Sequence, residues 1–318
     1  MDINGSVQTT GGILTENMYA GIIENICMVF GCSTEQLKDF TLLQKGLTNM
    51  VLSFRYNGGK YVYRHPGVGS QVLVDREREA IVQATVEEIG IDTTLVAMSV
   101  KHGWRISKYI DSRLFNYRSK SDMVRAIRVL KKLHSASPKV RWEFDIMDKM
   151  KEIKSKTPSE FESIFPGYHE LKVVVERLYE LASQDGIAKC LTHSDCRDEN
   201  FLINDKEIYL IDWEYAGFGD PGVDIGAYIC GGEHSVEDVE NVLRCYFGRT
   251  PTHVERCHFT AYIAITGFFF MHWTMLKESE GQEVFEIKRH WFGNTKKFSA
   301  VALELYGEEK RMIGGIAG

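Results

Sequence analysis

The sequence of 318 residues lacks an excess of basic charge, and it also lacks long apolar runs. Its formal net charge is −6 at pH 7, whereas a protein that binds nucleic acid usually carries a basic surface. The longest apolar stretch, YIAITGFFFMHW at 262–273, is shorter than the roughly 20 residues that a helix needs to cross a bilayer. The polar start, MDINGSVQTTGG, has no basic segment followed by an apolar core, as a signal peptide would. We therefore expect neither a nucleic-acid partner nor insertion into a membrane.

The sequence also gives no sign of a framework of disulfide bonds. The seven cysteines are scattered, none of them forms a CxxC pair, and an odd number argues against a set of disulfides. Such cysteines are typical of reduced thiols, which predicts a cytoplasmic protein. Apolar residues make up 44% of the chain and charged residues 26%, as in globular proteins, and the length allows two lobes with separate cores.

Residues 1–110 are expected to form a small lobe that contains an antiparallel sheet and one main helix. The apolar spacing in 15–30 predicts an additional helix at the start, which the following GCS ends. In VLSFRYNGGKYVYRHPG, two strand-like runs are joined by Asn57-Gly58-Gly59, a strong hairpin signal. The charged segment VDREREAIVQATVEEIG predicts the main helix, and TTLVAMSV and WRISKYI predict two further strands.

Residues 111–318 are expected to form a larger, mostly α-helical lobe. The segments 120–134, 168–184 and 251–306 have helical apolar spacing. The polar segment MDKMKEIKSKTPSEFESIFPG between the first two is expected to be exposed. Strand-like texture is confined to 191–215 in this half, so the fold class is α+β with two lobes.

The stretch LTHSDCRDENFLINDKEIYLIDWEY at 191–215 carries a chemical motif. His193, Asp195 and Asn200 fit the pattern H-x-D-x-x-x-x-N, and Asp212 follows the apolar run IYLI. In phosphoryl-transfer enzymes this pattern places an Asp that accepts the proton of the substrate hydroxyl, together with an Asn and a second Asp that bind Mg²⁺. We interpret Asp195 as the base and Asn200 and Asp212 as the metal ligands, because Mg²⁺ prefers oxygen ligands. The alternative is a chance match in an ordinary solvated hairpin.

The first lobe offers candidates for binding ATP. A kinase needs a cation on a strand over the phosphates and a carboxylate on a helix that holds it. Arg64 follows the glycine hairpin, and Glu79 lies in the next helix, so we expect them to form this pair. Gly46, Thr48 and Asn49, in the run GLTN, are candidates for a phosphate-covering turn whose backbone approaches the nucleotide closely. The alternative for this run is a simple β-turn.

Together these residues resemble the choline/ethanolamine kinase branch of the aminoglycoside-phosphotransferase-like kinases. The resemblance extends from about residue 43 to 273, and its most specific part is IDWEYAG at 211–217 with Asp220-Pro221 and Asp224. It implies a two-lobed protein-kinase-like fold, ATP as co-substrate and Mg²⁺ as cofactor. It also implies structural roles for His193, which would brace the loop, and for Asp224, which would tie the loop backbone through hydrogen bonds.

The resemblance further implies how an acceptor is bound. The family usually has two aromatic residues, three positions apart, on a late helix, and here Phe270 and Trp273 stand there, with Tyr215 as a third candidate wall. The alternative is that this helix is simply core. The family tends to place a Glu about two turns after the Asp224 position, where this chain has Gly231-Gly232 and then Glu233. Either Glu233 substitutes for that carboxylate, or aromatic faces hold the cation.

These expectations combine into one function. The leading hypothesis is an ATP-dependent kinase that transfers the γ-phosphoryl group to the hydroxyl of choline, giving phosphocholine. The acceptor could instead be ethanolamine, another amino alcohol or an aminoglycoside. A catalytically silent nucleotide-binding pseudokinase is disfavoured because Asp195, Asn200 and Asp212 are all present. The expected partners are therefore small molecules.

Overall fold

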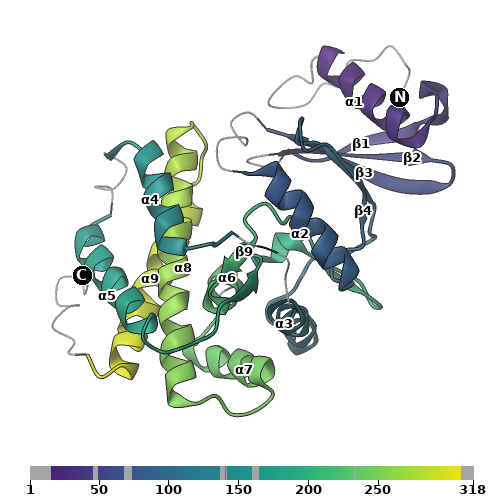
Figure 1. The fold of residues 1–318 in the computed structure, drawn as a ribbon. Coiled ribbons are helices and arrows are strands. Elements are labelled where there is room, and N and C mark those ends of the chain that lie inside the picture. Colours follow the sequence, from purple (N-terminus) through teal and green to yellow (C-terminus); the bar gives the residue numbers. More distant parts are fainter. Residues whose placement is uncertain are drawn as a thin grey trace. The chain divides into compact units, whose positions relative to one another are not determined.

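The computed structural model describes residues 16–45, 49–67, 74–136, 140, 142–159, 165–232 and 234–308. The chain divides into two compact units. The first consists of residues 1–83 and 92–111, and the second of residues 84–91 and 112–318. Both are visible in Figure 1.

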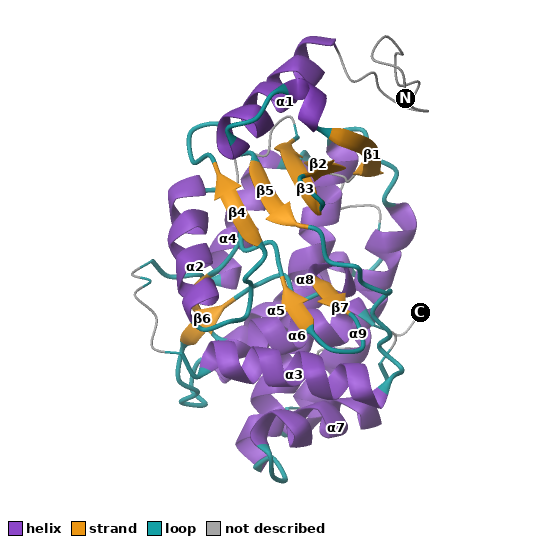
Figure 2. Ribbon diagram, turned by 90° about the vertical axis from the view of Figure 1, so that its right-hand side faces the viewer, coloured by secondary structure: helices purple, strands orange, loops and turns teal. Residues whose placement is uncertain are grey.

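The first unit is built on an antiparallel sheet. Its elements are α1 (Glu16–Phe30), η1 (Thr34–Gln36), β1 (Lys38–Lys45), β2 (Asn49–Tyr56), β3 (Gly59–Pro66), β4 (Leu95–Met98) and β5 (Arg105–Lys108), together with the first part of α2 (Arg76–Glu88). The strand order is β1-β2-β3-β5-β4, and every neighbouring pair is antiparallel (Figure 2). Strand β1 was not expected, because the alternation in KDFTLLQK is limited to Phe40 and Leu42, which pack against the core, and is obscured by the exposed Leu43.

The hairpin between β2 and β3 explains the glycine signal in the sequence. Asn57 and Gly58 both have positive φ, 45° and 79°, as a two-residue turn of the primed type requires. Tyr56 then pairs with Gly59. The turn fixes the register of β2 against β3, in which Arg64 lies opposite Val51. On its other side β3 pairs with β5, where Arg64 lies opposite Arg105.

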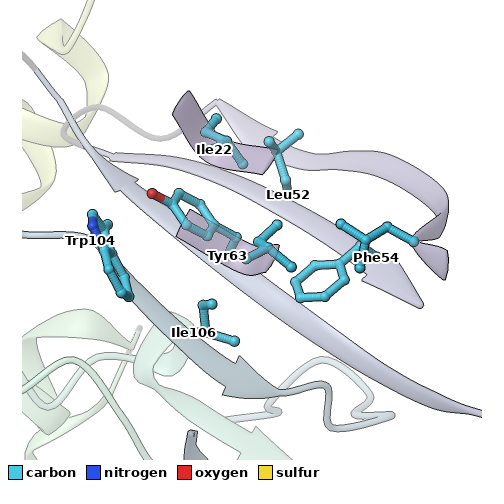
Figure 3. Close-up of a cluster of buried hydrophobic side chains, with 8 residues drawn as sticks. Ile22, Leu52, Phe54, Tyr63, Trp104 and Ile106 are labelled. Carbon is cyan, nitrogen blue, oxygen red and sulfur yellow. The ribbon is translucent and has the colours of Figure 1, made fainter. Parts of the chain in front are cut away.

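Helix α1 covers one face of this sheet and completes the core of the first unit. Ile22 and Ile26 from the helix pack with Phe54, Tyr63 and Ile106 from the strands, and all five are at most 1% exposed (Figure 3). Burial of apolar side chains is the main force that holds such a helix on a sheet.

The second unit is mostly helical. Its elements are α3 (Lys120–His134), α4 (Ile146–Lys156), α5 (Tyr168–Ala182), β6 (Cys190–Thr192), η4 (Asp198–Asn200), β7 (Phe201–Ile203), β8 (Ile208–Leu210), β9 (Gly217–Gly219), α6 (Pro221–Gly231), α7 (Val236–Phe247), α8 (His253–Ser279) and α9 (Phe285–Leu305). The expectation of an exposed polar segment after residue 146 was wrong in part. Helix α4 lies there, and it buries Ile146, Met150 and Ile153.

Helix α8 is the centre of the second unit and packs against α9, α6, α5 and α4. By length and composition alone it could cross a membrane, but 94% of its apolar window is buried inside the protein. Its contact with α6 is close. A Cβ added to Gly226 would lie 2.6 Å from Thr266 Oγ1 and 2.7 Å from the carbonyl oxygen of Tyr262. Only glycine allows the two helices this approach.

The motif-bearing stretch lies on two short antiparallel strand pairs in the second unit. Strand β6 pairs with β9, and β7 pairs with β8 in the register Phe201 opposite Leu210. The dipeptide Asp220-Pro221 then starts α6. Asp220 caps the helix by accepting a hydrogen bond from the Gly222 N–H at 2.8 Å, and proline occupies its first turn.

Candidate active site

Asp195 lies in the loop between β6 and β7 and has two polar partners. Arg197 Nε donates to Oδ1 at 2.7 Å, and Asn200 Nδ2 donates to Oδ2 at 2.9 Å. The side chain is only 14% exposed. Burial raises the pKa of Asp195, but the charge and hydrogen bond of Arg197 outweigh it and hold the pKa below its ordinary value. Asp195 is therefore ionised at neutral pH and able to accept a proton.

Asn200 and Asp212 come together through the β7–β8 hairpin. The Ile211 N–H donates to the Asn200 carbonyl oxygen at 3.0 Å, which places the next residue, Asp212, beside the start of β7. Asn200 Nδ2 points at Asp195, so the amide oxygen is the group left for a metal. One carboxylate and one amide oxygen fit Mg²⁺, which is often held by few protein oxygens and completed by phosphates and water.

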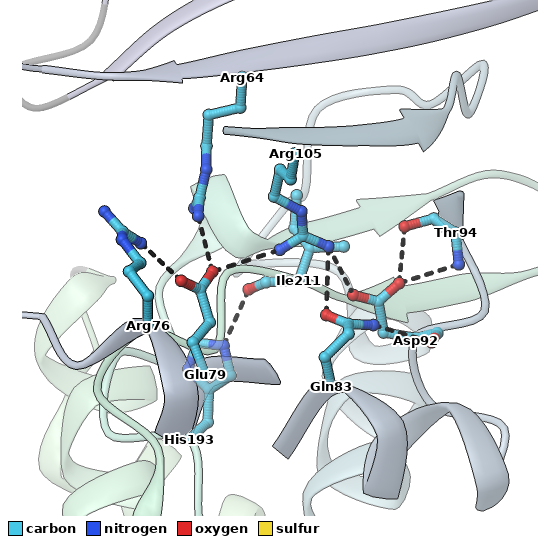
Figure 4. Close-up of polar contacts among 9 residues, drawn as sticks. All are labelled: Arg64, Arg76, Glu79, Gln83, Asp92, Thr94, Arg105, His193 and Ile211. Carbon is cyan, nitrogen blue, oxygen red and sulfur yellow. Dashed lines mark hydrogen bonds and ion pairs between the residues drawn. The ribbon is translucent and has the colours of Figure 1, made fainter. Parts of the chain in front are cut away.

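His193 braces these two parts of the site. Its Nδ1 accepts a hydrogen bond from the Asp195 N–H at 3.2 Å, so the proton of the ring is on Nε2. That nitrogen lies 2.8 Å from the Ile211 carbonyl oxygen, a bond drawn in Figure 4. Both ring nitrogens are thus engaged, and the ring also packs edge-on against the buried Trp213. This arrangement suits a brace rather than a proton-transfer group.

Asp224 fixes the backbone of the same loop from helix α6. Its carboxylate accepts hydrogen bonds from the N–H groups of His193 at 2.9 Å and Ser194 at 2.6 Å. It also lies 2.9 Å from His134 Nε2. Burial raises the pKa of Asp224, but the hydrogen bonds and His134 hold it below its ordinary value. Sequence reasoning missed His134, whose only signal was a histidine at the end of a predicted helix.

The backbone is strained at two places in this site. Ser194 and Asp212 have positive φ, 69° and 72°, in the left-handed region that costs most residues roughly 1 to 3 kcal/mol. Ser194 directly precedes the candidate base, Asp195, and Asp212 is itself a candidate metal ligand. Such strain persists only where the surroundings hold the backbone in place, as Asp224 does at Ser194.

In the first unit, Arg64 and Glu79 form the predicted pair, and Glu79 has further arginine partners (Figure 4). Arg64 Nη2 lies 2.6 Å from Glu79 Oε1, and Arg76 Nη1 lies 2.5 Å from Glu79 Oε2. Arg105 Nη1 is 3.8 Å from the same carboxylate. Arg64 and Arg105 face each other on adjacent strands, where like charges repel, and Glu79 lies between them. Sequence reasoning missed Arg76 and Arg105, although Arg76 precedes Glu79 by three residues, one helical turn.

A second buried carboxylate extends this network. Arg105 Nη2 lies 3.5 Å from Asp92 Oδ2 and donates to Gln83 Oε1 at 3.2 Å. Asp92 in turn accepts hydrogen bonds from the N–H and hydroxyl of Thr94 at 3.0 and 2.6 Å. The arginines on β3 and β5 are therefore held in fixed positions.

Several predicted site residues lie outside the described part of the chain, namely Gly46, Thr48 and Glu233. Asn49, predicted with the first two, is the first residue of β2 and is 9% exposed.

The candidate aromatic walls of the acceptor site lie in the second unit. Burial, with a further contribution from the charge of Glu214, raises the pKa of Tyr215 well above its ordinary value, and Trp273 opposes this rise in part. Phe270 is 5% exposed and stacks on Trp291 with ring centroids 4.9 Å apart. Arg197, which sequence reasoning also missed, has its Cζ 5.5 Å from the centre of the Phe270 ring.

Gly231, where the resembled family tends to have a glutamate, is closely surrounded. A Cβ there would lie 2.4 Å from the Tyr117 hydroxyl oxygen. Tyr117 is itself held, because its hydroxyl accepts a hydrogen bond from the Asp198 N–H at 2.8 Å. A side chain at position 231 would therefore require Tyr117 to move away from this position.

Comparisons with known proteins identify the family and the fold of this chain. The family model for choline/ethanolamine kinase matches residues 40–295. Protein LicA of Haemophilus influenzae is 24% identical over an alignment of 249 positions that covers 74% of this chain and 73% of that protein. The crystal structure of choline kinase LicA from Streptococcus pneumoniae has a TM-score of 0.77 at 20% identity and covers 90% of this chain and 100% of its own. A LicA structure in complex with AMP has a TM-score of 0.74 at 21% identity and covers 89% and 98%.

These likenesses confirm the expected kinase-like α+β fold, with its N-terminal antiparallel sheet and mostly helical remainder. The family model spans most of the sequence, including both the Arg64–Glu79 pair and the loop that carries Asp195. The chain therefore belongs to the choline/ethanolamine kinase family, whose members are small-molecule kinases.

Proposed function

We propose that this protein transfers the γ-phosphoryl group of ATP to the hydroxyl group of choline. The observation that carries the proposal is the ionised Asp195 carboxylate, which accepts a hydrogen bond from the Asn200 side chain. The backbone of Asn200 in turn pairs with Ile211, the residue before Asp212. A base and two oxygen ligands in one loop and hairpin are what phosphoryl transfer to an alcohol requires. The family and the LicA relatives support a kinase that acts on amino alcohols.

Asp195 is the proposed base. It orients the acceptor hydroxyl and takes its proton as the oxygen attacks the γ-phosphorus, while the bond from that phosphorus to the bridging oxygen of ADP breaks. His193 and Asp224 hold the loop so that the carboxylate meets the hydroxyl in one geometry, which favours reaction by fixing orientation.

Asn200 and Asp212 are the proposed ligands of Mg²⁺, which when bound with ATP neutralises charge on the phosphates. Arg64, held by Glu79, is the proposed phosphate-binding cation. Gly46, Thr48 and Asn49 are proposed to cover the nucleotide. The related LicA structure with AMP supports nucleotide binding by this fold.

ATP-dependent chemistry and free cysteines among the described residues fit the proposed cytoplasmic location.

The acceptor head is proposed to lie among Tyr215, Phe270 and Trp273, with Glu233 as a candidate carboxylate. Aromatic faces attract quaternary ammonium groups, which cannot donate hydrogen bonds. Ethanolamine is the second candidate acceptor, since the matching family model covers both kinds of kinase. Other amino alcohols and aminoglycosides remain alternatives that the test below separates.

The test is an assay of ADP release with choline, ethanolamine and several aminoglycosides as acceptors. We expect the highest kcat/KM with choline. Asp195→Ala serves as the blank and should lose about 10²- to 10⁴-fold in kcat, while its dissociation constant for ATP stays within a few-fold of wild type. Turnover with an aminoglycoside but not with choline would refute the acceptor, and full activity of Asp195→Ala would refute the base.

A further inference from the structure

The guanidinium group of Arg197 lies between the two features that are suited to recognise a positively charged acceptor. Its Nε donates to Asp195 Oδ1 at 2.7 Å, and Nη2 lies 3.4 Å from Oδ2. Its Cζ lies 5.5 Å from the centre of the Phe270 ring, within cation–π range. A positively charged side chain of the protein itself, Arg197, therefore already contacts both the candidate base, Asp195, and an aromatic wall, Phe270.

This placement matters because a quaternary ammonium group has few ways to bind. It relies on aromatic faces and on nearby carboxylates. Helix α6 offers no carboxylate at position 231, which is a glycine whose Cβ position is occupied by the Tyr117 hydroxyl. An acceptor head that binds at Phe270 therefore meets the guanidinium group of Arg197, which already contacts that ring and the carboxylate of Asp195.

We propose that Arg197 is a specificity-determining residue, which competes with the cationic head of the acceptor for Asp195 and Phe270. This inference rests on the proposed function, because it requires a cationic acceptor. The competition weakens the binding of quaternary ammonium alcohols more than that of primary ones. A primary ammonium donates hydrogen bonds to carboxylates and so replaces those that Arg197 gives up, whereas a quaternary ammonium cannot.

Glu199 provides a place for the displaced side chain. Arg197 Nη2 already lies 3.4 Å from Glu199 Oε2, and the Glu199 side chain is 62% exposed. The Arg197 side chain is 20% exposed, so it lies at the edge of the protein rather than deep inside it. Rotation about its side-chain bonds exchanges Asp195 for Glu199 without leaving the guanidinium unpaired. A small acceptor therefore needs little binding energy to displace Arg197 from Asp195.

The test compares KM for choline and for ethanolamine in the wild type, Arg197→Gln and Arg197→Lys. In Arg197→Gln we expect KM for choline to fall about three- to tenfold, since one cation–π contact and one ion pair no longer compete. KM for ethanolamine should change less, and kcat with choline should change less than KM does. Arg197→Lys keeps the charge and should stay close to wild type.

Calorimetric titration of the protein with choline in the absence of ATP gives a second readout. The dissociation constant should fall in Arg197→Gln by a factor similar to that in KM. Arg249→Gln is the matched control, because Arg249 also pairs with a carboxylate, Glu255 at 2.6 Å, and lies 5.1 Å over a ring, Phe247. It should leave both constants unchanged.

Two results would overturn the role of Arg197. One is an unchanged affinity of Arg197→Gln for choline. The other is a hundredfold loss of kcat with unchanged KM, which would assign Arg197 to the phosphoryl group instead. Wild-type turnover is measured first, and its absence with every cationic alcohol overturns the proposed function itself. Circular dichroism checks folding, and Arg197→Met, which keeps the aliphatic stem, replaces Arg197→Gln if that variant does not fold.

Discussion

At the scale of the residue, Glu79 is the carboxylate that the buried arginines of the first unit share. Its side chain is 1% exposed and pairs with Arg64 and Arg76. Glu79→Gln leaves these buried guanidinium groups without its charge, and breaking a buried ion pair costs about 3 to 5 kcal/mol. We expect urea denaturation to show a loss of that order in the free energy of unfolding. If Arg64 binds phosphate, KM for ATP should rise as well.

Glu77 provides the control for this prediction. It lies on the same helix, α2, but is exposed. Glu77→Gln removes the same charge two residues away and should change the free energy of unfolding by no more than about 0.5 kcal/mol. Equal losses in the two variants would show that the buried pairs of Glu79 are not what stabilises the first unit.

At the scale of the element, two helical glycines in the second unit should respond oppositely to the same change. Gly226→Ala places a methyl group 2.7 Å from a carbonyl oxygen of α8, and backbone cannot move aside cheaply. Crowding of this kind costs about 1 to 3 kcal/mol. Gly293 on α9 has open space around its Cβ position, so Gly293→Ala should stabilise by about 0.5 to 1 kcal/mol through helix propensity.

Thermal unfolding of the two variants measures this difference. Gly226→Ala should melt below the wild type and Gly293→Ala above it. A Gly226→Ala protein as stable as the wild type would mean that α6 and α8 are not tightly packed at this point.

Helices and hairpins were predictable from the sequence where a local pattern set them. Residues 120–134 alternate apolar and polar groups at helical spacing, and α3 has those bounds. Helix α4 was not recognised because only Ile146, Met150 and Ile153 mark its buried face among many charges. The three-residue strands β6 and β9 are too short for a pattern, and they exist because tertiary packing brings them together.

At the scale of the whole molecule, metal binding should depend on the nucleotide. Two protein oxygens, from Asn200 and Asp212, are proposed to hold Mg²⁺, and phosphates are needed to complete its coordination. Excess EDTA should therefore abolish turnover and remove the rise in melting temperature that ATP and Mg²⁺ together produce. The melting temperature of the protein without nucleotide should stay the same. A fall in that value on chelation would indicate a metal that stabilises the fold instead.

The candidate site was predictable in its motif residues and not in their partners. Asp195, Asn200 and Asp212 stand at a spacing that reflects one loop and one hairpin, so a linear pattern could identify them. The contact of Arg197 with Phe270 joins residues that are 73 positions apart. Such contacts depend on how α8 packs against the loop, which no local pattern encodes. His134 beside Asp224 was missed for the same reason.

The left-handed backbone at Ser194 and Asp212 has a consequence for how this protein can evolve in the laboratory. Glycine at either position relieves steric strain, although it adds freedom to the unfolded chain. A library screened only for heat resistance has no reason to keep the carboxylate at position 212 and can accept glycine there. Selection for robustness and selection for turnover then diverge at that residue, and only a screen that includes turnover retains the aspartate.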